Sequence, residues 1–306
     1  MLDGDKRALS RLMTYVDNRH EDLISIMSDV VDHAKGAWRI GVTGPPGSGK
    51  STLVDKLIGI YRSEGLKVGV VAIDPSSPFT GGAVLGDRIR MMDHGGDDGV
   101  FIRSLGSRGS HGGLSRATRD VVLLMDAFGF DVILIETVGV GQTELDIMAV
   151  ADTTVVVLVP ESGDTIQTMK AGLMEIADVF VVNKADREGA DRIYAELASL
   201  SQLFSHVQIP VFKTEAIHKK GIEELVLELK KLKTKKSSKH FKNLLVEETL
   251  DVFLSELATH VTQELSTKGK FKKQYTALTA KHKNPYRCAH DLIKFFLRRL
   301  HGKTNH

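Results

Sequence analysis

Gly44-Pro45-Pro46-Gly47-Ser48-Gly49-Lys50-Ser51 forms a complete G-x-x-x-x-G-K-S phosphate loop between an apolar run, 38–43, and a run of helical periodicity, 51–61. Its glycines let the backbone turn so that N–H groups face phosphate oxygens, and the N-terminus of the following helix favours negative charge. Lys50 supplies a charge to the β and γ phosphates and Ser51 offers its hydroxyl to Mg²⁺. The segment therefore predicts a nucleoside triphosphate with Mg²⁺ as the ligand. The expected contacts are Gly44, Pro45, Pro46, Gly47, Ser48, Gly49, Lys50, Ser51 and Thr52.

The bulk properties exclude several classes of protein. The chain has 306 residues and a formal net charge of +2, which gives room for one large α/β domain with helical additions. A single cysteine, Cys288, excludes an intramolecular disulfide framework. The longest apolar stretch, 121–135, is interrupted by Asp126 and Asp131 and so does not predict a membrane span. Because the first residues are also charged where a signal peptide would be apolar, we expect a protein of the cytoplasm, or of an equivalent reducing compartment, without a membrane partner.

The Lys-rich stretch 230–242 raises the question of nucleic-acid binding. No aromatic residue interleaves with its lysines before Phe241, whereas single-stranded nucleic acids are bound by basic and aromatic side chains together. We therefore expect a solvated linker here and no nucleic-acid partner.

The hydrophobic pattern predicts three regions. Helical spacing over about 6–34, with a break near Asn18, indicates an N-terminal helical extension, 1–36. From 37 to 234, short apolar runs alternate with helical runs, which predicts an α/β P-loop NTPase domain with a mostly parallel sheet covered by helices. Residues 235–306 return to helical periodicity, and their apolar face needs a partner, either the main domain or a second copy of the chain. The expected strands lie at 40–43, 68–73, 100–102, 132–135, 154–159, 179–182 and 211–212.

Ligands of such sheets bind at the carboxyl ends of the strands, so the polar residues there are the candidate site. Asp74 follows the second strand and can approach Mg²⁺, although a rigid proline turn is an equal alternative. The glycine-rich segment 80–91, with Asp87, resembles either a phosphate-sensing switch or a plain flexible loop. Glu136-Thr137-Val138-Gly139 follows a buried strand with the spacing of a D-x-x-G element. Glu136 would hold a Mg²⁺-bound or attacking water and the Gly139 N–H would detect the γ-phosphate, unless Glu136 only caps a helix.

Asn183-Lys184-Ala185-Asp186 predicts which base is bound. The Asp186 carboxylate can accept two hydrogen bonds from guanine, and adenine would leave it unpaired, so guanine is preferred. Asn183 would brace the loop, and the Lys184 stem would lie on the base. A second base-contacting loop is expected after the last strand, at Thr214-Glu215-Ala216.

Together these elements resemble the methylmalonyl-CoA mutase-associated GTPase family, within the metallochaperone-like P-loop GTPases. The matching stretches are GPPGSGKST at 44–52, AIDPSSPFTGGAVLGDRIRM at 72–91, SRGSHGGLS at 107–115, ETVGVGQTE at 136–144, GDTIQTMKAG at 163–172 and NKAD at 183–186. The resemblance covers about residues 5–232 closely and continues weakly to Asn284-Pro285-Tyr286.

The resemblance implies a GTPase that binds GTP and GDP and chaperones a cobalamin-dependent acyl-CoA mutase. GTP hydrolysis would gate adenosylcobalamin loading and protect or reactivate the holoenzyme, and the C-terminal helices would form a homodimer. The resemblance places Lys170 in a third switch. This chain departs from the family in the last guanine loop, where it has Glu215 and the family usually has Ser. Its catalytic residues would be Lys50, Asp87, Glu136 and Gly139, and its Mg²⁺ ligands Ser51, Asp74, Asp87 and Glu136.

Three other functions are compatible with a phosphate loop. A nickel-delivering GTPase would need clustered Cys and His ligands, which Cys288 and the scattered histidines do not supply. A small-molecule kinase or transport ATPase would tolerate ATP, against which Asp186 argues. A scaffold that binds GTP and barely hydrolyses it is the third. Slow intrinsic hydrolysis is expected in any case, because the sequence does not place an arginine finger and Arg108 is no more than a candidate for one.

Overall fold

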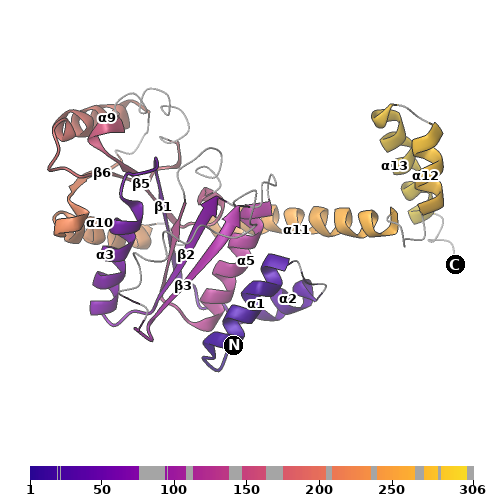
Figure 1. Cartoon of the computed structure of the whole chain (residues 1–306), viewed down its shortest axis with the longest axis horizontal. Coiled ribbons are helices and arrows are strands. Elements are labelled where there is room, and N and C mark those ends of the chain that lie inside the picture. The colour runs from indigo at the N-terminus through magenta and orange to yellow at the C-terminus, as the bar shows by residue number, and fades with distance from the viewer. Residues whose placement is uncertain are drawn as a thin grey trace. The chain divides into compact units, whose positions relative to one another are not determined.

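The computed structural model describes residues 1–18, 20, 22–75, 94, 96–107, 113–137, 147–162, 175–204, 209–235, 240–265, 272–281 and 284–301. The chain forms two compact units, 1–237 and 238–306. The larger unit is an α/β domain built on a sheet, and the smaller unit is helical in its described part (Figure 1).

The sheet of the larger unit has seven strands, all parallel, in the order β3-β2-β4-β1-β5-β6-β7. All seven predicted strands are present, and most extend beyond the apolar run that predicted them. Their long runs of Val, Ile and Leu are typical of strands covered on both faces. The bounds are β1 Trp38–Thr43, β2 Val68–Pro75, β3 Val100–Ser107, β4 Val132–Glu136, β5 Thr153–Leu158, β6 Val179–Asn183 and β7 Val211–Thr214.

Helices cover both faces of the sheet, which gives three layers (Figure 1). One face packs on α3, Lys50–Ser63, and α10, Ile222–Lys235. The other packs on α5, Gly113–Phe128, and α9, Ala190–Phe204, with the 3-10 turn η2, Ile147–Ala149. Alternate residues of each strand enter the two cores because side chains of a strand point to opposite faces. Two more 3-10 turns follow β5 and β7, η3 at Pro160–Ser162 and η4 at Ala216–His218.

The N-terminal helices pack against the domain. Helix α1, Lys6–Asn18, ends where the sequence predicted a break, and α2 follows at Leu23–Val31. Leu9 and Met13 are fully buried in the same apolar core as the α5 residue Met125. The N-terminal helical extension is thus part of the core of the larger unit.

The smaller unit contains α11, His240–Leu265, α12, Lys272–Lys281, and α13, Pro285–His301. The prediction of a solvated linker at 230–242 was wrong over most of its length, because α10 continues to Lys235 and α11 begins at His240. Lysine is a good helix former, and buried Leu229 and half-buried Leu232 keep this part of α10 on the domain. None of the described helices combines the length and apolar character that crossing a bilayer requires.

Candidate functional site: a phosphate loop braced by a guanine-type loop

The strand order brings the predicted loops to one edge of the sheet. The phosphate loop follows β1, Thr137 follows β4, Asn183 ends β6, and Glu215 follows β7. Because the strands are all parallel, these segments all leave the sheet at its carboxyl edge, where ligands of open α/β sheets bind. The candidate site therefore lies at this edge, around the N-terminus of α3.

The phosphate loop has the backbone that its glycines predict. Gly44, Gly47 and Gly49 have φ of 136°, 75° and 88°, which L side chains rarely adopt. A Cβ on Gly44 would lie 2.0 Å from the carbonyl oxygen of Val157 in β5, so only glycine fits against that strand. Helix α3 begins at Lys50, which directs the helix N-terminus at the loop.

Lys50 lies inside its own loop. Its ammonium group donates hydrogen bonds to the carbonyl oxygens of Gly44, at 2.8 Å, and Pro45, at 3.0 Å, and the side chain is buried. The ammonium is thus already positioned where the loop would hold the phosphates. Bound phosphate oxygens offer it stronger, charge-assisted partners than these carbonyls.

Ser51 and Glu136 are brought together as a pair. The Ser51 hydroxyl donates to Glu136 Oε1 at 2.6 Å, although the two residues are 85 positions apart, and both are buried. Beside them, the hydroxyls of Thr43 and Thr137 share a buried hydrogen bond of 2.8 Å, which ties the ends of β1 and β4. A buried hydroxyl and carboxylate are hard oxygen donors of the kind Mg²⁺ prefers, so the residues present fit that ion.

Asn183 connects the two nucleotide loops. It is buried, and its Nδ2 donates to the carbonyl oxygen of Ser48 at 2.8 Å. Its Oδ1 accepts from the Thr214 hydroxyl at 3.0 Å and from the Ala216 N–H at 3.2 Å. One amide therefore holds the phosphate loop, the end of β6 and the loop after β7 in one arrangement, as its expected bracing role requires.

Lys184 makes a second connection that the sequence did not indicate. Its φ of 56° lies in the left-handed region, and its ammonium donates to the Gly47 carbonyl oxygen at 2.8 Å. This contact draws the Lys184 stem across the phosphate loop. The neighbouring Asp186 is exposed, with its carboxylate accessible to a base.

Glu215 is engaged within its own turn. Its carboxylate accepts from Lys220 at 3.0 Å and lies 3.1 Å from His218 Nδ1, and the Lys220 hydrogen bond is the main cause of its lowered pKa. The Ala216 N–H donates to Asn183 Oδ1 at 3.2 Å. The described contacts thus give this loop a bracing role.

Several predicted residues cannot be placed in the site. Asp74 belongs to β2, but its side chain is not among those described. Asp87, Arg108, Gly139 and Lys170 lie outside the described residues. The described part of the candidate site therefore consists of the phosphate loop, Glu136 and the two base-side loops.

A phosphate loop on a parallel sheet, with an N-K-x-D loop joined to it by hydrogen bonds, defines a P-loop nucleoside triphosphatase of the guanine-binding type. The family model described as methylmalonyl Co-A mutase-associated GTPase MeaB matches residues 9–269. The chain belongs to this family and is a GTPase, and its ligand is a guanine nucleotide.

Individual relatives agree with this assignment. A protein of Pyrococcus abyssi, itself provisionally named a GTPase, is 47% identical over 96% of this chain and 94% of its own length. GTPase ArgK of Escherichia coli is 38% identical over 72% of this chain and 70% of its own. Among solved structures, one described as an LAO/AO transport system kinase superposes with a TM-score of 0.67 at 26% identity, covering 97% of this chain and 95% of that one.

Proposed function

We propose that this GTPase is a chaperone for a cobalamin-dependent acyl-CoA mutase, with methylmalonyl-CoA mutase as the client. In this proposal GTP hydrolysis gates adenosylcobalamin loading and protects or reactivates the holoenzyme. The observation that carries it is the family itself, which is described as associated with methylmalonyl-CoA mutase and matches 9–269. The nucleotide site supports it, because a chaperone of this kind needs a switch that distinguishes GTP from GDP.

Each residue of the site has a separate role in this proposal. On nucleotide binding, Lys50 exchanges its two carbonyl partners for β- and γ-phosphate oxygens, and Asp186 accepts the two guanine donors. Ser51 and Glu136 would hold Mg²⁺, which when bound neutralises charge on the phosphates. Glu136 also orients the attacking water. Asp74, Asp87 and Gly139 complete the proposed site, with Lys170 coupling it to the client.

The bracing network supports a switch of this design. Asn183 and Lys184 join the base-side loop to the phosphate loop through hydrogen bonds of 2.8 Å each. Ligand contacts at either loop are therefore transmitted to the other through two short hydrogen bonds, of which the Asn183 bond is buried and the Lys184 bond is exposed. We propose that base and phosphate are recognised together, so that fragments of GTP bind far more weakly than the whole nucleotide.

We further propose a homodimer formed through the region 235–306, in the cytoplasm. Helix α11 carries four exposed apolar side chains at the spacing of one helical face: Leu250, Phe253, Leu254 and Leu257. An exposed apolar stripe of this kind is stabilised when a second chain covers it.

The deciding experiment measures GTP hydrolysis by the purified protein alone and with purified methylmalonyl-, isobutyryl- or ethylmalonyl-CoA mutase. We expect stimulation by methylmalonyl-CoA mutase alone. An Asp186→Asn variant supplied with xanthosine triphosphate is the matched control, because an amide donates to the xanthine 2-oxo group where the carboxylate accepts. With xanthosine triphosphate, the Asp186→Asn variant should again show hydrolysis stimulated by the mutase and should load the cofactor. With GTP, the same variant should do neither. Stimulation by none of the three mutases would reject the chaperone proposal while leaving the GTPase assignment intact.

A further inference from the structure

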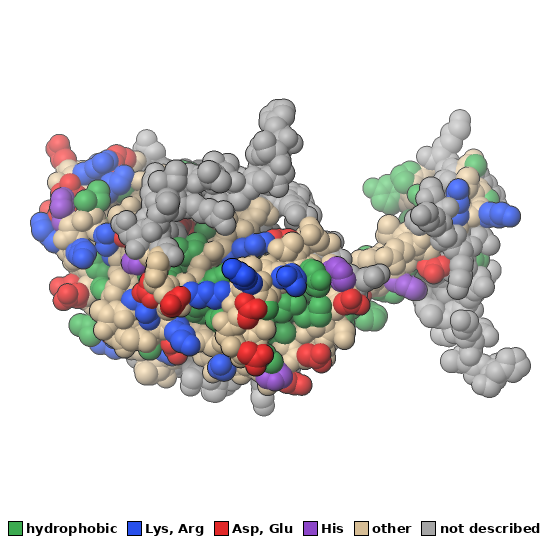
Figure 2. Space-filling model, turned by 60° about the horizontal axis from the view of Figure 1, so that its bottom comes forward, with side chains coloured by type: hydrophobic (Ala, Val, Ile, Leu, Met, Phe, Trp, Pro, Cys, Tyr) green, Lys and Arg blue, Asp and Glu red, His purple; other side chains and the backbone are tan. Residues whose placement is uncertain are grey.

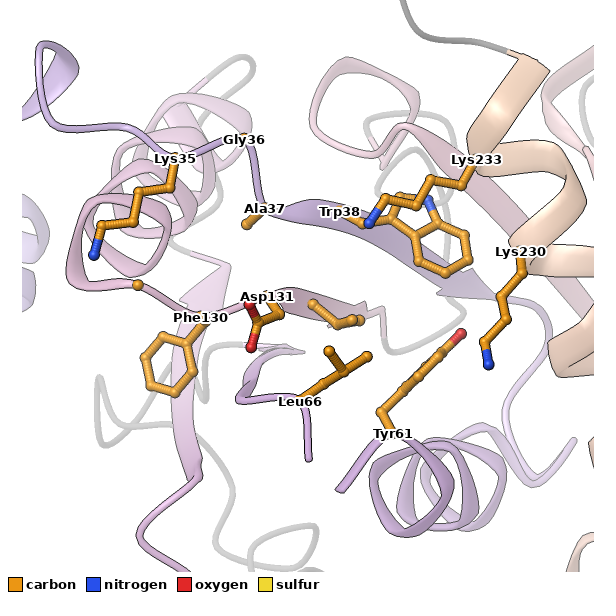
Figure 3. A pocket seen from close by; sticks show the side chains of 12 residues that line it. Lys35, Gly36, Ala37, Trp38, Tyr61, Leu66, Phe130, Asp131, Lys230 and Lys233 are labelled. Atoms are coloured by element: carbon orange, nitrogen blue, oxygen red, sulfur yellow. The ribbon is translucent and has the colours of Figure 1, made fainter. Parts of the chain in front are cut away.

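The larger unit contains a cavity at the opposite end of the sheet from the phosphate loop. It has a volume of about 250 Å³. Trp38 and Val132 are the first residues of β1 and β4, and Leu66 lies between α3 and β2, so the cavity opens at the amino ends of the strands. Figure 3 shows α3, α10 and the start of β1 around it. Nothing in the nucleotide chemistry uses this end of the domain.

The cavity combines apolar walls with positive charge. Trp38, Tyr61, Leu66 and Phe130 supply rings and an aliphatic surface. Lys35, Lys230 and Lys233 also line it, against one carboxylate, that of Asp131. In Figure 2, which brings the lower side of Figure 1 forward, Lys and Arg side chains lie among acidic and apolar ones on this face.

The charges facing the cavity are unequally neutralised. The Lys230 ammonium donates to Glu64 at 2.6 Å, and Asp131 Oδ2 accepts the Lys67 backbone N–H at 2.7 Å. Lys233 has no carboxylate partner among the described residues, and its ammonium lies 5.4 Å from the centroid of the Trp38 ring. A cation that faces an aromatic ring beside a cavity remains available to an anion.

Tyr61 provides an independent indication of a ligand. Its side chain is fully buried, yet its hydroxyl has no hydrogen-bond partner among the described residues. Its ring packs edge-on against Trp38 at 6.1 Å, and in Figure 3 the hydroxyl points toward Trp38 and Lys230. Burial raises the pKa of this phenol, so the hydroxyl stays a neutral donor. Buried polar groups are nearly always paired, which indicates that an acceptor belongs beside it.

We propose that this cavity binds a small organic anion, with its apolar body against Trp38 and Leu66 and its carboxylate between the Tyr61 hydroxyl and the ammonium groups of Lys230 and Lys233. Lys230 and Lys233 lie three residues apart on α10 and so project from one face of the helix. Two cations and one neutral donor match a carboxylate, which accepts several hydrogen bonds.

The size and charge of the cavity exclude larger ligands. Drug-sized sites occupy about 300–1,000 Å³, so a volume near 250 Å³ suits a single ring or a short acyl chain and is too small for a nucleotide. Asp131 would also repel a polyanion that extended along the cavity toward Lys35. A monocarboxylate is therefore the class of ligand that fits.

Benzoate is the test probe, titrated into protein saturated with GDP and Mg²⁺ and followed by calorimetry and saturation-transfer NMR. The nucleotide blocks anion binding at the phosphate loop. We expect saturable binding of benzoate with one site per chain, and much weaker binding of benzyl alcohol and benzylamine, which match its ring without its charge. Lys233→Met should weaken benzoate about tenfold, the loss of one charge-assisted contact. Tyr61→Phe should also weaken it about tenfold, because a hydroxyl that donates to a carboxylate makes a charge-assisted hydrogen bond.

Lys231→Met is the matched control, because Lys231 lies on the same helix, pairs with Glu228 and does not line the cavity. It should bind benzoate like the unaltered protein. Tyr61→Phe should keep the thermal midpoint of the unaltered protein, because the hydroxyl it removes has no partner to lose. Absence of saturable benzoate binding would overturn the proposal, as would equal binding by Lys233→Met and Lys231→Met. GDP affinity, measured separately on each variant, tests the nucleotide site independently of the cavity.

Discussion

Replacing Asn183 with Ala removes a buried side chain that joins the phosphate loop to the loop after β7. The amide makes three buried hydrogen bonds, to the Ser48 carbonyl, the Thr214 hydroxyl and the Ala216 N–H. At about 1 kcal/mol of net stability for each, the variant should lose about 3 kcal/mol. For a domain of about 150–250 residues this lowers the thermal midpoint by roughly 6–12 °C.

The assay follows the fluorescence of Trp38 during heating. Trp38 is the single tryptophan of the chain and lies in the larger unit, so the signal reports on that unit without a contribution from 238–306. Thr214→Val is the graded control. It removes one of the three bonds and should lower the midpoint by roughly 2–4 °C, for a loss of about 1 kcal/mol. GDP affinity should fall in the Asn183→Ala variant, because the phosphate loop loses its brace.

The result that would refute this reasoning is a midpoint for Asn183→Ala within roughly 2 °C of the unaltered protein, a loss of less than about 1 kcal/mol. The three hydrogen bonds would then contribute nothing net, and the connection between the loops would have to depend on Lys184 and the packing of the strands. Equal decreases in the thermal midpoint of Asn183→Ala and Thr214→Val would mean that only the Thr214 hydrogen bond of Asn183 contributes to stability.

Four further outcomes are expected. Gly44→Ala should unfold at lower temperature and lose nucleotide binding by calorimetry, because its Cβ would lie 2.0 Å from a backbone oxygen of β5; an unaltered midpoint would contradict the loop geometry. Lys50→Ala should weaken GTP at least about tenfold, and calorimetry giving the original affinity would remove it from the site. Asp186→Asn should weaken GTP and favour xanthosine triphosphate in a competition assay, and an unchanged preference would refute base recognition by this carboxylate. The Arg62 hydrogen bond lowers the pKa of Asp97 from 3.8 to about 2, so the stabilisation by this pair is present above pH 4 and is lost as the pH falls toward 2. Asp97→Asn should therefore make the thermal midpoint depend less on pH between about 4 and 2. A pH dependence identical to that of the unaltered protein would exclude the Arg62–Asp97 pair as a cause of it.

Local pattern alone determined much of this protein. The phosphate loop needs particular residues within eight positions, and the strands are runs of apolar β-branched residues, so both are visible without any knowledge of distant contacts. The guanine-type loop is equally local. The one clear error, a linker at 230–242, arose because charge was given more weight than helix propensity and the apolar spacing of Leu229 and Leu232.

Only the tertiary structure decided how these segments work together. The order β3-β2-β4-β1-β5-β6-β7 places the end of β4 beside that of β1, so that Glu136 meets Ser51 and the two threonine hydroxyls meet. Asn183 reaches Ser48 across 135 positions of sequence, and no local periodicity encodes such a contact. The cavity at the amino ends of the strands likewise depends on β1, β4, α3 and α10 meeting. The physical reason is that side-chain hydrogen bonds and cavities depend on where distant backbones come to lie, which the packing of helices on the sheet fixes only when the whole domain has formed.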